Sequence, residues 1–247
     1  MDHGVQHMID PTSLDYSMLS KGDLANIVLQ RSEVLLGIKR PGDVIRQWID
    51  GDATRLNAEV ESKGAILAQR AARTIQAEFE ALQPILDKLN PKKIADIGCG
   101  YAFFDLFAHA RYDCDVLLID IESNDHRHFG FEEEAAAYTS LQTARNFLQS
   151  NGVPAPRITT WNPEKDDLEE GVKPDLAVSF LSCGYHFPVD MYMPFFRFGI
   201  APGGTVILDL RGAAFQENKR VLSKLGRVEV IAQGKGRKRV LVRKGKK

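Results

Sequence analysis

The sequence has few cysteines, no long apolar run and almost no net charge. Its 247 residues include three cysteines, and the formal net charge is −1. The odd number of cysteines, without the spacing of a zinc site, favours free thiols in a reducing compartment. No apolar run approaches the ~20 residues that cross a bilayer. The balanced charge gives no global attraction to nucleic acid or to a membrane surface.

The start of the chain, MDHGVQHMIDPTS, lacks a basic region followed by an apolar stretch. We therefore expect no signal peptide, a cytoplasmic location and no membrane partner. The composition is that of an ordinary globular protein, and the length suits one large α/β domain with an appendage. Nothing in the sequence indicates the oligomeric state.

The most informative stretch runs from Lys92 to Glu122. Residues 94–97 form a short apolar run that ends at glycine, which is typical of a buried parallel strand before a tight turn. Gly98, Gly100 and the small Ala102 then occupy alternate positions, where a backbone without bulky side chains can turn sharply and approach a ligand. The pattern predicts a strand followed by a ligand-binding turn.

A helix and a second strand follow this turn. Residues 103–110 have helical spacing, and the apolar run 116–119 ends at Asp120. Asp96 and Asp120 therefore both fall at the carboxyl ends of predicted strands, where open α/β sheets bind ligands. A carboxylate at the position of Asp120 can accept hydrogen bonds from both hydroxyls of a ribose.

The turn fits a dinucleotide less well than S-adenosylmethionine. The dinucleotide fingerprint places small residues at 98, 100 and 103, but position 103 is Phe, which would crowd the helix against the strand. The segment DIGCGYA instead resembles motif I of class I S-adenosylmethionine-dependent methyltransferases. Ala102 stands where that motif has its third glycine, a departure from the pattern.

The elements around this stretch extend the resemblance. Residues 1–90 are predicted to be helical, with Ser20 as an N-cap. A long helix is expected to begin at Asp52 or Thr54 and to end at Leu89, with Pro84 kinking or dividing it. After position 90 we expect five β/α steps and a hairpin, with strands at 94–97, 115–120, 157–161, 175–181, 205–210, 228–231 and 239–242. A Pro-Gly-Gly turn at 202–204 precedes the fifth strand, another feature that resembles the family.

Over residues 90–243 this order resembles the class I methyltransferase topology. The resemblance implies an α/β, Rossmann-like sheet of seven mostly parallel strands, strand 7 antiparallel, with helices on both faces. We expect residues 91–247 to be the S-adenosylmethionine-binding domain and residues 1–90 to be a helical N-terminal extension that acts as a lid.

The resemblance also implies which residues hold S-adenosyl-L-methionine. The acid after strand 2, Asp120, would bind the ribose. Ile121 and Glu122 would line the adenine side, together with residues after strand 3. The glycine turn would lie against the cofactor. The candidate cofactor-binding residues are Asp96, Gly98, Gly100, Ala102, Asp120, Ile121, Trp161, Asn162 and Ser182. Trp161 could equally be a plain core aromatic.

The loop after strand 4 usually faces the methyl group in this family. Residues 182–190 lack the motif of enzymes that methylate exocyclic base amines. Cys183 does not follow proline, so a buried thiol is favoured over a nucleophile. His186 is the candidate catalytic residue, as a general base for a hydroxyl nucleophile, and a purely structural histidine is the alternative. The three consecutive residues His126, Arg127 and His128 are predicted to lie in a solvated polar loop.

The basic stretch 235–247 has two interpretations. It could contact phosphate, or its basic residues could alternate outward and protect a sheet edge. We expect a methyltransferase that O-methylates a small polar metabolite or sugar, with no metal. The alternatives are an RNA methyltransferase and a non-catalytic or dinucleotide-binding Rossmann-like protein.

Overall fold

The computed structural model describes residues 9–122, 139–234 and 236–246, which form two compact units. The first, which we call the sheet unit, comprises Leu89–Cys99, Tyr112–Ile121 and Ala155–Lys247. The second, the helical unit, comprises Met1–Lys88, Gly100–Arg111 and Glu122–Pro154. Both units draw on separate stretches of the chain, so they differ from the functional division into 1–90 and 91–247, which stays a prediction.

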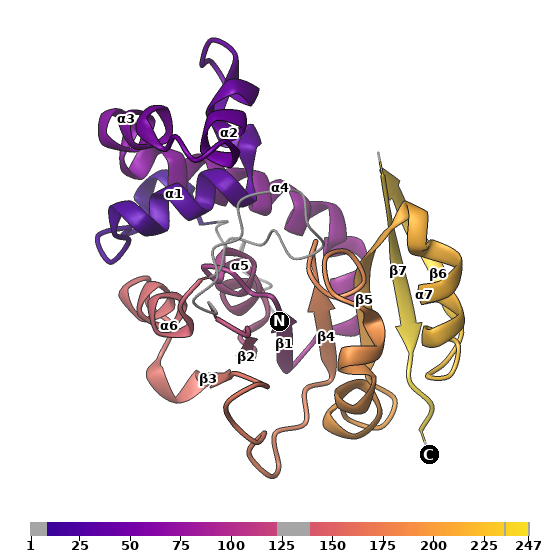
Figure 1. Ribbon diagram of the computed structural model, residues 1–247. Coiled ribbons are helices and arrows are strands. Elements are labelled where there is room, and N and C mark those ends of the chain that lie inside the picture. Colours follow the sequence, from indigo (N-terminus) through magenta and orange to yellow (C-terminus); the bar gives the residue numbers. More distant parts are fainter. Residues whose placement is uncertain (1–8, 123–138, 235, 247) are drawn as a thin grey trace. The chain divides into compact units, whose positions relative to one another are not determined.

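The sheet unit is built on seven strands (Figure 1). The strands are β1 (Lys93–Ile97), β2 (Asp115–Ile119), β3 (Ile158–Trp161), β4 (Leu176–Ser179), β5 (Thr205–Arg211), β6 (Val228–Gly234) and β7 (Arg237–Arg243). Their order in the sheet is β3-β2-β1-β4-β5-β7-β6. The first five are parallel, and β7 runs antiparallel between β5 and β6. The predicted fold class and strand arrangement are confirmed.

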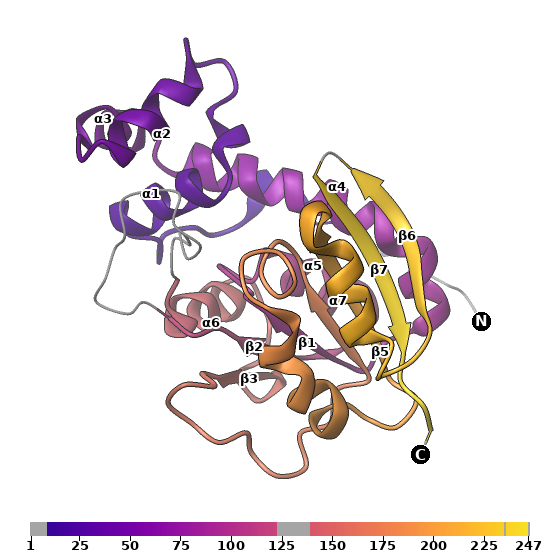
Figure 2. The same ribbon diagram turned by 45° about the vertical axis from the view of Figure 1, so that its right-hand side comes forward.

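One face of this sheet forms the core of the sheet unit. Alternate residues of β1, β2, β4, β5 and β7, such as Ile97 and Leu208, are fully buried on it. They pack against helix α7 (Phe215–Leu222) and against two short helical turns, η4 (Val189–Tyr192) and the π-helical η5 (Phe195–Gly199). Helix α7 lies beside the β6–β7 hairpin (Figure 2). Buried strands of this kind are apolar runs in the sequence, and these runs are what predicted the strands.

Two of the expected β/α steps contain no α-helix. Residues 162–175, between β3 and β4, are all described and form turns and irregular chain. Between β4 and β5 the chain forms η4 and η5 instead. The expectation of five regular β/α steps was wrong here. The segment 162–170 is polar and acidic, so it offers no apolar stripe for a helix to bury.

The helical unit contains the other α-helices. These are α1 (Lys21–Gln30), α2 (Pro41–Ile49), α3 (Thr54–Lys63), α4 (Ala65–Leu89), α5 (Phe103–Tyr112) and α6 (Leu141–Ser150), with the short turns η1 (Pro11–Ser13) and η2 (Ser32–Leu35). Ser20 caps α1 as predicted, and Asp23 completes a reciprocal capping box. No helix among the described residues is long and apolar enough to cross a membrane.

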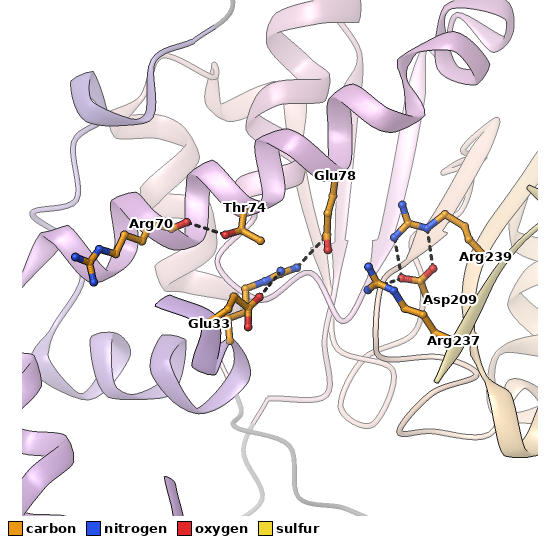
Figure 3. Close-up of polar contacts among 8 residues, drawn as sticks. Glu33, Arg70, Thr74, Glu78, Asp209, Arg237 and Arg239 are labelled. Carbon is orange, nitrogen blue, oxygen red and sulfur yellow. Dashed lines mark hydrogen bonds and ion pairs between the residues drawn. The ribbon is translucent and has the colours of Figure 1, made fainter. Parts of the chain in front are cut away.

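Aromatic contacts explain why α5 and α6 belong to the helical unit. The Phe103 ring meets the Phe147 ring edge-on at 4.9 Å, and Tyr16 stacks on Phe147 at 5.8 Å. Phe79 of α4 packs edge-on against Phe104 at 5.5 Å. An ion-pair network adds to this, because Arg31 bridges Glu33 and Glu78 at 3.2 and 3.1 Å (Figure 3).

The long N-terminal helix divides at Gly64 and not at Pro84. Gly64 has φ 50° and ψ −128°, a conformation that only glycine adopts readily, and it separates α3 from α4. Pro84 lies inside the continuous helix α4. Of the two predicted effects of Pro84, division of the helix was wrong, because apolar residues on both sides of it, such as Leu82 and Leu86, are buried and hold α4 in place. A kink at Pro84 stays a prediction.

Replacement of Pro84 should therefore stabilise the protein. Pro84 is exposed, so Pro84→Ala removes no core packing. It restores a backbone N–H to the helix and relieves the clash of the ring with the preceding turn. We expect the free energy of unfolding to rise by about 1–3 kcal/mol. Urea denaturation measures this change, with Gln83→Ala as the neighbouring control; an equal or lower stability of Pro84→Ala would contradict the argument.

Candidate functional site

The carboxyl ends of β1 and β4 mark the switch point of the sheet. From β1 the chain continues to β2 and β3 on one side, whereas β4 and β5 lie on the other. In open α/β sheets the ligand binds at the carboxyl ends beside such a point. Asp96, Asp120, Trp161 and Ser182 all lie at or directly after carboxyl ends of these strands, so within the sheet unit the structure brings them to one edge.

Gly98 is required both by its conformation and by its surroundings. Its φ is +72°, and a Cβ added there would lie 2.4 Å from both Cβ and Oγ of Ser182. The Gly98 backbone N–H donates to the carbonyl of Ile119 at 2.7 Å. The turn after β1 thus lies between the residue preceding Asp120 and the loop after β4, with no room for a side chain.

The left-handed conformation recurs at alternate positions of the turn. Gly100 has φ +57° and Ala102 has φ +59°. Ala102 departs from the glycine of the motif but keeps the backbone conformation that the glycine would adopt. A non-glycine residue there stores strain, of the kind that collects at functional sites. The spacing of small residues in the sequence predicted a sharp turn here.

Ser179 is a site residue that sequence reasoning missed. Its side chain is fully buried, and its hydroxyl donates to the Ile97 carbonyl at 2.7 Å. The same oxygen accepts a hydrogen bond from the Cys183 backbone N–H at 2.9 Å. The hydroxyl therefore ties the end of β1 to the loop after β4. A small polar residue at the end of an apolar strand was the available signal.

The residues after β2 and β3 are joined by Asn162. Its side chain is buried, donates to the Ile121 carbonyl at 2.9 Å and accepts from the Glu164 N–H at 3.0 Å. This contact fixes the backbone next to Asp120. Burial raises the pKa of Tyr192 in η4, and the negative charge of Asp120 raises it further. The sequence did not single out Tyr192.

Trp161 lies at an apolar groove of the sheet unit. Its indole N–H donates to the Asp166 carbonyl at 2.9 Å, and its ring lies 5.4 Å from that of Phe195. The groove has a volume of 530 Å³, and its apolar walls come from Trp161, Leu168, Val172, Pro194, Phe195 and Phe198. Whether Trp161 also flanks an adenine stays a prediction.

The Ser182 carbonyl organises the loop that carries His186. It accepts backbone N–H groups from Tyr185 at 3.0 Å, His186 at 2.9 Å and Phe187 at 3.1 Å. Gly184, with φ +85°, donates to the Phe187 carbonyl at 2.7 Å. The loop is therefore a compact structure of defined shape, and it presents the exposed His186 at its tip.

The environment of His186 keeps its imidazole neutral. Although the residue is exposed overall, partial burial of the ring lowers its pKa, and the positive charge of Arg211 lowers it further. The ring lies 5.1 Å from that of Tyr185, edge to face. A neutral, accessible imidazole near pH 7 can accept a proton.

The burial of Cys183 argues against a role as a nucleophile. Cys183 is fully buried, and burial raises the pKa of its thiol, so it stays protonated. Cys99 and Cys114 are also buried free thiols. Within the described part of the chain no group of three or more His, Cys, Asp or Glu side chains could hold a metal ion.

Several remaining expectations concern charged residues. The triad His126–His128 lies outside the described residues. Glu122, expected on the adenine side, accepts a hydrogen bond from the Leu141 N–H at 3.0 Å at the start of α6. In the basic stretch, Arg239 does not point outward but is buried against Asp209, and the Lys244 ammonium donates to the carbonyl of Ile200 at 2.6 Å.

A substitution at Gly98 tests the steric argument. Gly98→Ala should destabilise the protein by about 1–2 kcal/mol through its left-handed backbone, and further through the clash with Ser182. Gly236 is a matched control, because its φ is +74° and nothing lies within 4 Å of an added Cβ. Thermal unfolding should show a larger loss for Gly98→Ala than for Gly236→Ala. Ser182→Gly should recover part of it in the double variant; equal losses would exclude the clash.

No model of a known protein family matches the sequence, and no curated protein matches it. A putative O-methyltransferase from Nostoc punctiforme PCC 73102 is 15% identical in its solved structure, with a TM-score of 0.51 over 92% of this chain and 69% of that chain. An O-methyltransferase family protein from Burkholderia thailandensis is 11% identical, with a TM-score of 0.44 over 71% of this chain.

The chain covers 60% of the Burkholderia protein, which is less than two thirds of its length. Human N-acetylserotonin methyltransferase, solved with SAM, is 15% identical, with a TM-score of 0.46 over 91% of this chain and 66% of that chain. At such low sequence identity, similarity to a solved structure supports an inference about the fold alone. The strand order, together with the likeness to the Nostoc structure, identifies the fold as that of the class I S-adenosylmethionine-dependent methyltransferases.

Proposed function

We propose that this protein is an S-adenosylmethionine-dependent methyltransferase that acts on a hydroxyl group of a small polar acceptor. The observation that carries the proposal is the hydrogen bond from Gly98 to Ile119, at 2.7 Å. It places Gly98, which has no side chain, directly beside the end of β2, where Asp120 follows. A ribose-binding carboxylate beside a tight turn is the arrangement that a nucleoside cofactor requires.

The residues of the turn and of the end of β2 fit such a cofactor. Gly98 and Gly100 are half-buried and have no side chain, buried Ala102 shares their left-handed conformation, and Asp120 offers a carboxylate for the ribose hydroxyls. Ile121 lies on the adenine side, with its carbonyl held by Asn162. When bound, S-adenosylmethionine supplies an electrophilic methyl group. The chain itself has to position the acceptor and to remove a proton from it.

His186 is the residue that we assign to proton removal. Its lowered pKa keeps the imidazole neutral near pH 7, and the loop geometry holds it beyond the end of β4. An unhindered neutral amine would need less help from a base, which is why a hydroxyl acceptor is favoured. An RNA acceptor receives less support, because Arg237, Arg239 and Lys244 of the basic stretch make contacts within the sheet unit.

Asp120→Ala should weaken the binding of S-adenosylhomocysteine. The substitution removes charge-assisted hydrogen bonds to the ribose, so we expect the dissociation constant to rise about 10- to 100-fold. Asp120→Asn keeps the shape and should lose less. Isothermal titration calorimetry of both variants measures the effect. An unchanged affinity in Asp120→Ala, in a protein that keeps its thermal stability, would assign the ribose site elsewhere.

The rate of methyl transfer should fall at acidic pH. His186 must be neutral to accept a proton, and its pKa is lowered, so the rate should be constant near neutrality and decline only below the usual pKa of histidine. His186→Ala should lower kcat ~10²- to 10⁴-fold and remove this acidic limb. Its affinity for S-adenosylhomocysteine should stay unchanged.

The matched control for this prediction is His109→Ala, a histidine of α5. Turnover is followed as the formation of S-adenosylhomocysteine with a panel of hydroxylated acceptors across the pH range. A His186→Ala variant with normal kcat and an unchanged pH profile would show that the histidine has only a structural role.

A further inference from the structure

A charged cluster occupies the face of β5 and β7 that lies opposite the core of the sheet unit. In the antiparallel register Asp209 pairs with Arg239 and Arg211 pairs with Arg237, so these four side chains share one face. Asp209 is fully buried and accepts two hydrogen bonds from Arg239, at 2.7 and 2.8 Å. Arg237 approaches the same carboxylate at 3.3 Å (Figure 3).

Asp209 is held by two of these arginines. Arg239 donates to both of its carboxylate oxygens, and Arg237 contacts the same carboxylate. Among the described residues none forms an ion pair with Arg211, which is exposed. The charge of Arg211 therefore takes no part in the Asp209 ion pairs that join β5 to β7.

Arg211 also borders the loop that carries His186. Its backbone N–H donates to the Gly184 carbonyl at 2.9 Å, and its guanidinium lies over the Tyr185 ring, 5.8 Å from the centroid. Its charge acts on His186, as the lowered pKa of that histidine indicates. The aromatic ring limits the positions of the guanidinium and leaves its hydrogen-bonding edge available to a ligand.

We propose that Arg211 forms an anion subsite beside His186, and that the methyl acceptor carries a carboxylate or phosphate group bound there. The inference rests on the proposed function and deepens it by naming the substrate class. A planar guanidinium binds both anions through two parallel hydrogen bonds. Tyr185 provides a flat surface for the body of the acceptor, and His186 lies next to it to receive the proton.

The test uses small probes of known charge. Benzoate and phenyl phosphate represent the two anionic groups, and benzyl alcohol is the neutral counterpart. Binding is followed by NMR titration of the His186 ring. Among the described residues, the charge that lowers the pKa of this ring is that of Arg211, which shares a sheet face with Asp209, Arg237 and Arg239. An anion bound at Arg211 should therefore raise the pKa of His186, whereas benzyl alcohol should leave it unchanged.

Two substitutions distinguish the effect of the positive charge of Arg211 from the effect of its planar guanidinium group, which donates two parallel hydrogen bonds. Arg211→Gln should weaken the binding of the preferred anion at least tenfold and should itself raise the pKa of His186. Arg211→Lys keeps the charge and should lose less affinity. Arg227→Gln is the matched control, because its side chain is 88% exposed and its nearest acidic partner is Glu229 at 3.8 Å. This control should bind the anions like the unchanged protein.

Each outcome has a defined meaning. Weaker binding in Arg211→Gln supports the subsite, and the better of the two anions identifies carboxylate or phosphate. Equal binding of anions by Arg211→Gln, or no effect of either anion on His186, would overturn it. Calorimetry with S-adenosylhomocysteine on the same samples keeps the two proposals apart. In Arg211→Gln, a loss of anion binding with unchanged affinity for S-adenosylhomocysteine concerns only the subsite. An unsubstituted protein that does not bind S-adenosylhomocysteine would overturn the proposed function alone.

Discussion

The hydroxyl of Ser179 is the contact on which the arrangement of the site depends. It donates to the end of β1 and accepts from the backbone of Cys183, so one buried oxygen sets the separation of two loops. Both partners are backbone groups, and a buried backbone group without a partner is costly. Together with the parallel pairing of β1 and β4, this bridge holds the two segments at the spacing at which Ser182 closely approaches Gly98.

The carbonyl of Ser182 extends this arrangement toward His186. Three successive backbone N–H groups converge on it, so the shape of the loop does not depend on hydrogen bonds from the side chains of Tyr185 and His186. The side chains of Tyr185 and His186 are therefore available for contacts with a ligand. Arg211 is joined to the same loop through Gly184. A substitution at Ser179 would thus alter the positions of His186 and Arg211, although Ser179 is not adjacent to either residue in the sequence.

Sequence reasoning located the elements whose signals are local. The apolar runs before Gly98 and Asp120 predicted β1 and β2, and Ser20 predicted the start of α1, because burial and capping act within a few residues. Pro84 was misread because tertiary packing outweighed a local preference, and Gly64, whose backbone is the true break, carried no stronger signal than other glycines. The pair Asp209–Arg239 could not be predicted, since it depends on the register of strands 30 residues apart.

The antiparallel course of β7 has a consequence for the order in which the site forms. Because β7 reverses direction, its first residues, Arg237 and Arg239, lie at the same edge as the carboxyl end of β5. On a ribosome, β1 to β5 are made well before this strand. Until it is inserted, Asp209 has neither of these two arginines, and a buried carboxylate without a partner is unstable. Burial of Asp209 is therefore unfavourable until β7 is inserted between β5 and β6.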